Sequence, residues 1–202
     1  KVTQQSTSDT FSGNDTQTLT YSYSTPTWHY SDDPALPDIN SCTLCSSRHW
    51  NDFRGSELVT VTDGSGAKSE QRFHRGMHND RDTTAGGTFS ANITLSDATT
   101  RADENWLRGQ TVEARRLTSA NSAKSRSVNW FTWTLNAGTG INGAYFVAQQ
   151  KSESTIYGTA NKTTRVEYTY DAYGNVTRQL LHGDTSTTTD DRNVERSYVY
   201  HA

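Results

Sequence analysis

Several segments of the chain alternate apolar with polar residues, and this alternation restricts the fold to β-sheet more than any other feature. In residues 18–23, Leu19, Tyr21 and Tyr23 alternate with threonine and serine. A period of two places successive side chains on opposite faces of a strand, so such segments are expected to be half-buried strands. Similar segments span 58–62, 70–74, 88–96, 112–117, 127–135, 144–152, 164–170, 176–181 and 194–201.

The composition favours a thin sheet over a thick hydrophobic core. Hydrophobic residues make up 31% of the 202 residues, whereas ordinary domains approach about half. Disordered chains are poor in aromatic residues and high in net charge, but this chain has 5 Trp, 10 Tyr and 6 Phe with a net charge of -3. Abundant threonine and serine disfavour long helices. We therefore expect an all-β fold of repeated antiparallel hairpins in a twisted, spiralling sheet, with few or no helices.

The chain divides by composition into three parts. Residues 1–24 are expected to form N-terminal strands, and residues 58–202 a series of β-hairpins. Residues 25–57 contain all three prolines and both cysteines and show little periodicity. We interpret this part as a long ordered excursion, because Trp28, Tyr30 and Trp50 are too apolar to be left in water.

Three segments share a frame of a strand, an aspartate, a four-residue turn and a second strand. The aspartate side chain can accept a hydrogen bond from a backbone N–H two residues on, and glycine or asparagine tolerates the left-handed conformation. One hairpin is marginal alone, and repetition lets each hairpin pack on its neighbours. The expected turn residues are Asp63, Gly66, Asp97, Asp171, Gly174 and Asn175.

The third copy of this frame lies in a decapeptide, YTYDAYGNVT at residues 168–177, that resembles the YD repeat of RHS-repeat proteins. Further segments resemble recurrent segments of large secreted bacterial RHS proteins. They are FRG at 53–55, VTVTD at 59–63, FHRGM at 73–77, DR at 80–81, 103–109, GDT at 183–185 and DDR at 190–192. The resemblance covers roughly residues 50–202 and extends more loosely to the threonine-rich N-terminal strands.

The resemblance implies a structural role. In that family the repeats wind into a spiralling β-sheet that closes as a hollow shell around a toxin or another effector. The family's terminal core segment, with its aspartate-based cleavage site and DPxG-type motif, is absent from these residues. The expected function is therefore a wall segment of a secreted or cell-surface protein. Its expected partners are neighbouring repeats of the same or an identical chain and an enclosed effector, and it needs no cofactor and catalyses nothing.

Cys42 and Cys45 form a CxxC motif, with His49 four residues further on. Two cysteines this close in a secreted protein more often form a disulfide, which is the favoured interpretation. Thiolate and imidazole ligands at this spacing also suit part of a zinc site. A zinc ribbon needs a second CxxC, which the chain lacks; His29, His74 or His78 would have to complete the site. Free or redox-active thiols are the third alternative.

The aromatic residues and the sheet edges suit two other functions. Trp28, Trp50 and Trp106 are the candidates for stacking on surface glycans in an adhesin or carbohydrate-binding module, although packing between hairpins is the more ordinary role of such rings. The last strand, 194–201, is expected to be an exposed edge, which would suit a subunit of an extracellular filament.

Other classes of function are disfavoured. The pI of about 6.1 argues against nucleic-acid binding, which requires a basic face. No apolar run approaches the ~20 residues of a membrane span. No nucleophile elbow or phosphate-binding loop is present, and an enzyme is the least supported class.

Overall fold

The computed structural model describes the chain except for residues 9–15, 31–49, 84–85, 89, 140–142 and 201–202. Its residues fall into two compact units that interleave along the sequence. Unit 1 comprises Lys1–Ser22, Thr60–Gln71 and Thr111–Ala202, and unit 2 comprises Tyr23–Val59 and Arg72–Gln110. Each unit is described separately below.

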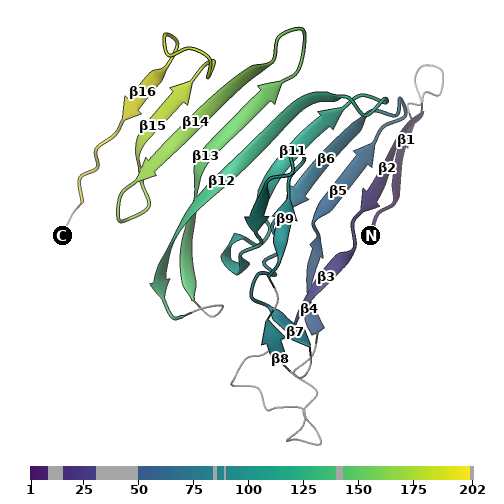
Figure 1. Ribbon diagram of the computed structural model, residues 1–202, viewed down its shortest axis with the longest axis horizontal. Coiled ribbons are helices and arrows are strands. Elements are labelled where there is room, and N and C mark those ends of the chain that lie inside the picture. The colour runs from purple at the N-terminus through teal and green to yellow at the C-terminus, as the bar shows by residue number, and fades with distance from the viewer. Residues whose placement is uncertain (9–15, 31–49, 84–85, 89, 140–142, 201–202) are drawn as a thin grey trace, which may run out of the picture. The chain divides into compact units, whose positions relative to one another are not determined.

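Unit 1 carries most of a ten-stranded antiparallel sheet (Figure 1). The strands lie almost entirely in chain order, so each hairpin packs beside the next. Their order is β1 (Gln4–Ser8), β2 (Thr16–Tyr23), β5 (Leu58–Thr62), β6 (Lys68–Phe73), β11 (Thr111–Leu117), β12 (Ala123–Ala137), β13 (Ala144–Ile156), β14 (Lys162–Tyr170), β15 (Val176–His182) and β16 (Arg192–Glu195).

Unit 2 contains three short two-stranded sheets and a single helical turn. The sheets are β3 (Pro26–Tyr30) with β4 (Trp50–Ser56), β7 (Arg81–Thr83) with β8 (Gly86–Thr88), and β9 (Asn92–Thr94) with β10 (Thr100–Ala102); the 3-10 turn is η1 (Asn105–Leu107). Its apolar core is small. The buried apolar side chains are Tyr30, Met77, Ala91, Ile93, Leu95 and Leu107.

The predicted all-β fold of antiparallel hairpins is confirmed, and η1 is the only helix among the described residues. In that part of the chain no helix is long and apolar enough to cross a membrane. Two predicted strands are shorter than expected. Within the segment 88–96, Thr88 ends β8 and Asn92–Thr94 form β9. β9 ends there because a turn begins at the Leu95 N–H, which bonds Thr99 O at 2.8 Å. The strand predicted over 194–201 ends at Glu195.

Two of the predicted turns have the hydrogen bonds that the repeated frame requires. Asp63 Oδ1 accepts the N–H groups of Ser65 and Ala67 at 2.9 and 3.1 Å. Asp171 Oδ1 likewise accepts the N–H groups of Tyr173 and Asn175, both at 2.9 Å. The fourth turn position is left-handed in each, with φ of 83° at Gly66 and 86° at Gly174. This is a type I turn followed by a left-handed residue, a common three-residue hairpin loop.

Asp97 does not occupy the position that the frame gave it. Its Oδ1 accepts the Thr99 N–H at 3.0 Å, but the hairpin is closed by Leu95, whose carbonyl accepts the Ala98 N–H at 3.0 Å. Asp97 thus sits two residues later in its turn than Asp63 does. The left-handed residue is Ala98, with φ of 67°. The pairing of β9 with β10 determines which residues form the turn. The aspartate that the three segments have in common therefore did not identify the register of this turn.

A further turn of the same geometry follows β11 and was not predicted from the sequence. Thr118 replaces the aspartate, and its hydroxyl accepts the Ser122 N–H at 3.1 Å. Asn121 is left-handed, with φ of 63°. Its side-chain oxygen accepts Lys68 Nζ at 2.7 Å, so the turn after β11 contacts the start of β6. A Thr-x-x-Asn pattern between two strands was the available signal.

Cross-strand polar pairs support the strands of unit 1, whose described residues include only three buried apolar side chains, Val112, Leu117 and Val128. Val128 alone is buried among the described residues of β12 to β16. Opposite charges facing each other across strands stabilise a sheet modestly. The charged pairs are Glu70–Arg115 at 3.6 Å, Glu113–Arg126 at 2.6 Å and Glu153–Arg165 at 2.7 Å. His182 Nδ1 and Asp191 Oδ2 also form a hydrogen bond, at 2.9 Å. These pairs add modest stabilisation to a sheet with few buried hydrophobic residues.

The compact units divide the chain differently from the composition. The composition separated residues 25–57 as an excursion, whereas the structure unites Tyr23–Val59 with Arg72–Gln110. That part also contains two regular strands, β3 and β4. Register shifts at 27/28 and 29/30 interrupt their pairing, and such irregularities obscure a period-two pattern.

Candidate functional site

Four aromatic side chains of unit 2 pair across β3 and β4, and we call Trp28, Tyr30, Trp50 and Phe53 the aromatic cluster. Trp28 lies opposite Phe53, with ring centroids 5.1 Å apart, and Tyr30 lies opposite Trp50 at 5.2 Å. Tilted and edge-on arrangements at these distances are favourable for aromatic rings. Alternate residues of β3 share one face, so Trp28 and Tyr30 belong to the same surface.

The aromatic cluster has a buried end and an exposed end. Tyr30 is buried, with the Arg81 guanidinium 4.6 Å from its ring centroid. Trp28 and Phe53 are each 46% exposed, and Trp50 is 37% exposed. Three rings held by strand pairing therefore present apolar surface to solvent, which is typical of a ligand-binding surface.

The three tryptophans proposed for glycan stacking do not all meet. Trp28 and Trp50 belong to the aromatic cluster, whereas Trp106 lies in η1 and is half-buried. Phe53 is the third exposed ring, and Tyr30 is its buried neighbour in the cluster; neither was proposed for glycan stacking from the sequence. The alternation in Thr27-Trp28-His29-Tyr30 was the available signal.

Ion pairs of unit 2 extend from β4 to η1 and the residues beside it. Asp52 accepts two hydrogen bonds from Arg108, at 2.8 and 2.9 Å, and lies 2.9 Å from Arg54 Nε. Arg54 Nη1 reaches Asn105 Oδ1 at 2.8 Å. Burial and the nearby Arg108 charge lower the pKa of Arg54, but an arginine stays protonated under physiological conditions. These contacts fix the position of β4 and therefore the positions of its aromatic residues, Trp50 and Phe53.

Asp103 is the most buried charged group of unit 2, with no exposed surface. Its Oδ1 accepts the backbone N–H groups of Arg75 and Gly76 at 2.7 and 2.9 Å, and its Oδ2 accepts Arg75 Nε at 3.1 Å. Burial acts to raise the pKa of Asp103, but the nearby His74 side chain, the hydrogen bond from the Gly76 N–H and the charge of Arg75 outweigh it and lower the pKa. The carboxylate is therefore ionised and fully hydrogen-bonded.

Gly76 is required at this point for two reasons. Its φ is +77°, and a side chain would meet Arg54 Nη1 at 2.9 Å and the Asn105 carbonyl oxygen at 3.0 Å. The glycine lets the backbone of the 74–76 segment approach Asn105 closely.

His29 and Asp80 form a histidine–carboxylate pair in unit 2. His29 Nδ1 lies 2.7 Å from Asp80 Oδ1, which also accepts the Arg81 N–H at 2.8 Å. A catalytic triad needs the imidazole to contact a hydroxyl or thiol as well, and the hydrogen-bond partner of His29 among the described residues is this carboxylate. No group of three or more His, Cys, Asp and Glu side chains in the described ranges could hold a metal ion.

Cys42, Cys45 and His49 lie outside the described residues, so the disulfide and the alternative zinc site remain predictions. His74, one of the histidines considered as a fourth ligand, is 2% exposed and lies 3.7 Å from Asp103. His74 thus lies beside a buried carboxylate.

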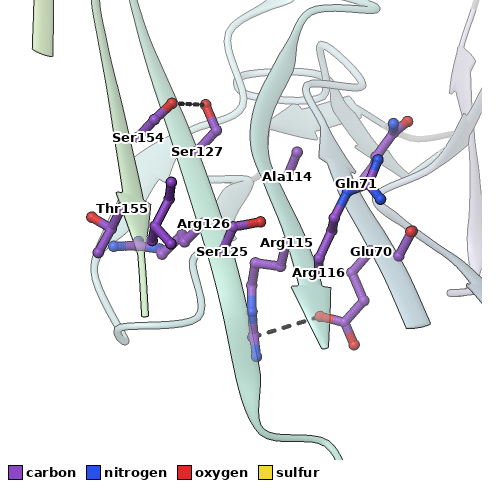
Figure 2. Close-up of a pocket in the computed structure, with 12 residues that line it drawn as sticks. Glu70, Gln71, Ala114, Arg115, Arg116, Ser125, Arg126, Ser127, Ser154 and Thr155 are labelled. Atoms are coloured by element: carbon purple, nitrogen blue, oxygen red, sulfur yellow. Dashed lines mark hydrogen bonds and ion pairs between the residues drawn. The ribbon is translucent and has the colours of Figure 1, made fainter. Parts of the chain in front are cut away.

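A shallow groove of about 290 Å³ crosses β6, β11, β12 and β13 of unit 1 (Figure 2). Two of its charged side chains, Glu70 and Arg115, pair with each other, and Ser154 donates to Ser127 at 3.2 Å (Figure 2). The lining residues include serines and a threonine but no histidine. A hydroxyl without a neighbouring base is a poor nucleophile, so the groove is a polar surface between strands.

Comparisons with protein-family models, with curated proteins and with solved structures find no match to this chain. The fold and the surfaces described here define it as an all-β protein whose large sheet is built from consecutive hairpins. The resemblance to RHS repeats rests on the sequence segments alone.

Proposed function

We propose that the chain is a structural wall segment of an RHS/YD-repeat-like shell or scaffold at the cell surface or outside the cell. Its sheet forms a barrier around cargo, or joins further copies, and it catalyses no reaction. The YD-like decapeptide at 168–177 and the ordered segments around it support this proposal.

One observation supports the proposal most. Five consecutive strands, β12 to β16, run side by side with Val128 as their one buried side chain among the described residues. A soluble domain normally buries one face of its sheet on a second layer. A sheet that instead relies on cross-strand ion pairs and hydrogen-bonded turns suits a thin wall with solvent or cargo on either side.

The end strands of the sheet favour continuation into more sheet. Among the described strands, β1 and β16 each pair on one side only. β1 has the sequence QQSTS, with neither charge nor proline, whereas isolated sheets usually protect their edges with such residues. An unprotected edge is suited to pairing with another strand.

The decisive experiment measures the protein as its native source produces it. The denatured, reduced protein is detected with an antibody against this chain, and its mass is compared with 22.5 kDa. A wall segment of a large shell gives a band far above that mass, and the amides of β1 and β16 exchange slowly in the intact protein. A band at 22.5 kDa with rapidly exchanging edge amides would contradict the shell.

A second candidate function is carbohydrate binding by the aromatic cluster. The three exposed rings of Trp28, Trp50 and Phe53 favour it specifically, because exposed aromatic surface held on a rigid strand pair is available for stacking.

A glycan array separates the two functions. If the aromatic cluster binds glycans, Trp28→Ala lowers affinity about tenfold or more, as expected for an aromatic anchor. Trp133→Ala is the matched control, because Trp133 is similarly exposed, at 42%, but belongs to β12. Equal losses in both variants, or no binding by the unmodified chain, would exclude this second function.

A further inference from the structure

Two exposed tyrosines of unit 1 lie in ring contact near the C-terminal end of the sheet. Tyr173 is in the turn after β14, and Tyr200 is in the segment after β16. Their ring centroids are 4.4 Å apart, with an interplanar angle of 33°. The other described tyrosine pair, Tyr168 and Tyr170, is wider, at 6.5 Å.

Several contacts hold this pair in place. The Tyr200 hydroxyl donates to Asp171 Oδ2 and accepts Asn175 Nδ2 at 3.0 Å. The preceding residues follow β15, since the Arg196 N–H bonds Thr177 O at 2.8 Å and the Tyr198 hydroxyl bonds Val176 O at 3.0 Å. These hydrogen bonds hold Tyr200 and the residues before it against β15 and the turn that contains Tyr173.

Both rings are accessible to a reagent in solution. Tyr173 is 73% exposed and Tyr200 is 46% exposed. Rings this exposed do not belong to the hydrophobic core, and the pair lies at the turn after β14. Exposed phenols in contact are suited to chemistry that couples two rings.

We propose that Tyr173 and Tyr200 are a site of dityrosine formation by a peroxide-driven one-electron oxidant, such as a haem peroxidase with hydrogen peroxide. Each phenol gives up one electron and one proton to form a tyrosyl radical. The two radicals join through a carbon–carbon bond between ring positions next to the hydroxyls, and both rings regain their aromatic form. Overall, two phenols and one hydrogen peroxide give one dityrosine and two water molecules.

Asp171 has a defined part in this step. Its carboxylate already accepts the hydrogen bond of the Tyr200 hydroxyl, so it can receive the phenolic proton as the electron leaves. The carboxylate of a turn residue thereby favours oxidation of the ring that it contacts.

The cross-link would join the turn after β14 to the segment after β16. It would close a loop that contains β15 and β16, and such a covalent loop restricts the unfolded chain as a disulfide does. The edge of the sheet would then be fastened covalently, which would benefit an extracellular protein of any function.

The test oxidises dilute protein with a haem peroxidase and a limiting amount of hydrogen peroxide, and then isolates the monomer. Tryptic peptides 166–178 and 197–202, which contain Tyr173 and Tyr200, should appear joined, with their summed mass reduced by two hydrogen atoms. Fragmentation should place the bond on these two residues. Oxidised monomer should also unfold at a higher temperature than untreated protein.

Three variants make the result specific. Tyr173→Phe and Tyr200→Phe should each lower the intramolecular yield about tenfold or more, because held contact replaces diffusional encounter. Tyr168→Phe is the control, since Tyr168 lies on the same tryptic peptide as Tyr173 but its ring faces Tyr170 at 6.5 Å; it should retain the yield. Circular dichroism confirms that each variant is folded. Cross-links spread over other tyrosines, cross-links found only in dimers, or an equal loss in Tyr168→Phe would overturn the proposal.

Discussion

Removal of the Asp103 carboxylate tests whether a buried ionic network, rather than apolar packing, holds unit 2 together. In Asp103→Ala the backbone N–H groups of Arg75 and Gly76 lose their acceptor, and the half-buried Arg75 guanidinium loses a partner at 3.1 Å. Each unsatisfied buried donor costs about 1–3 kcal/mol. Arg75 keeps Glu57 Oε2 as a partner at 3.3 Å, so the two N–H groups dominate, and we expect a loss of about 4 kcal/mol in the free energy of unfolding.

The measurement is urea unfolding, with hydrogen exchange used to locate the loss. With a slope of about 2 kcal/mol per M, the midpoint of unit 2 should fall by about 2 M. Amides in 72–110 should lose protection before those in 123–182. Asp82→Ala is the matched control, because Asp82 is exposed, and it should change stability by less than about 0.5 kcal/mol. Similar midpoints for the two variants would refute the reasoning.

The pH dependence gives an independent check on the same carboxylate. The pKa of Asp103 is lowered in the folded protein from an ordinary value of 3.8. Its contribution to stability is therefore present above the unfolded pKa and is lost as the pH falls through the folded pKa. Turn carboxylates with lowered pKa, such as Asp171, add to the acid loss in both proteins. Asp103→Asn should show a shallower decline below about pH 4 than the unmodified chain; parallel curves would contradict this assignment.

The remaining predictions concern unit 1. Gly174→Ala should lower stability by about 2 kcal/mol, since φ is +86° and a side chain would lie 2.6 Å from Phe146 Cε2. Gly64→Ala, in an open part of another turn, should have almost no effect in thermal unfolding, and equal shifts would count against the turn geometry. Arg126→Met should leave the buried Glu113 carboxylate without its partner at 2.6 Å and cost about 3–5 kcal/mol. Arg116→Met, at an exposed neighbouring position, should change the urea midpoint little; a comparable loss there would contradict a special role for the Glu113–Arg126 pair.

The sequence alone determined the all-β fold and most strands of the large sheet. A period of two is a local property, since it depends only on the alternation of side chains along one strand. The turns at Asp63 and Asp171 were predictable for the same reason, because their hydrogen bonds join residues at most four positions apart. Asp97 marks the limit of this approach, because the pairing of its strands placed it two residues later in its turn.

The tertiary structure alone decided what the individual side chains meet. The Asp103–Arg75 ion pair joins residues 28 positions apart, the Asp52–Arg108 pair 56 positions and the Tyr200–Asp171 contact 29 positions. No local pattern encodes these separations. They depend on which strands pair and on bulges such as those of β4, which pair Phe53 with Trp28 and Trp50 with Tyr30. The alternation of the sequence therefore specified strands, whereas strand pairing across the chain created the aromatic cluster, the buried ion pairs and the tyrosine contact.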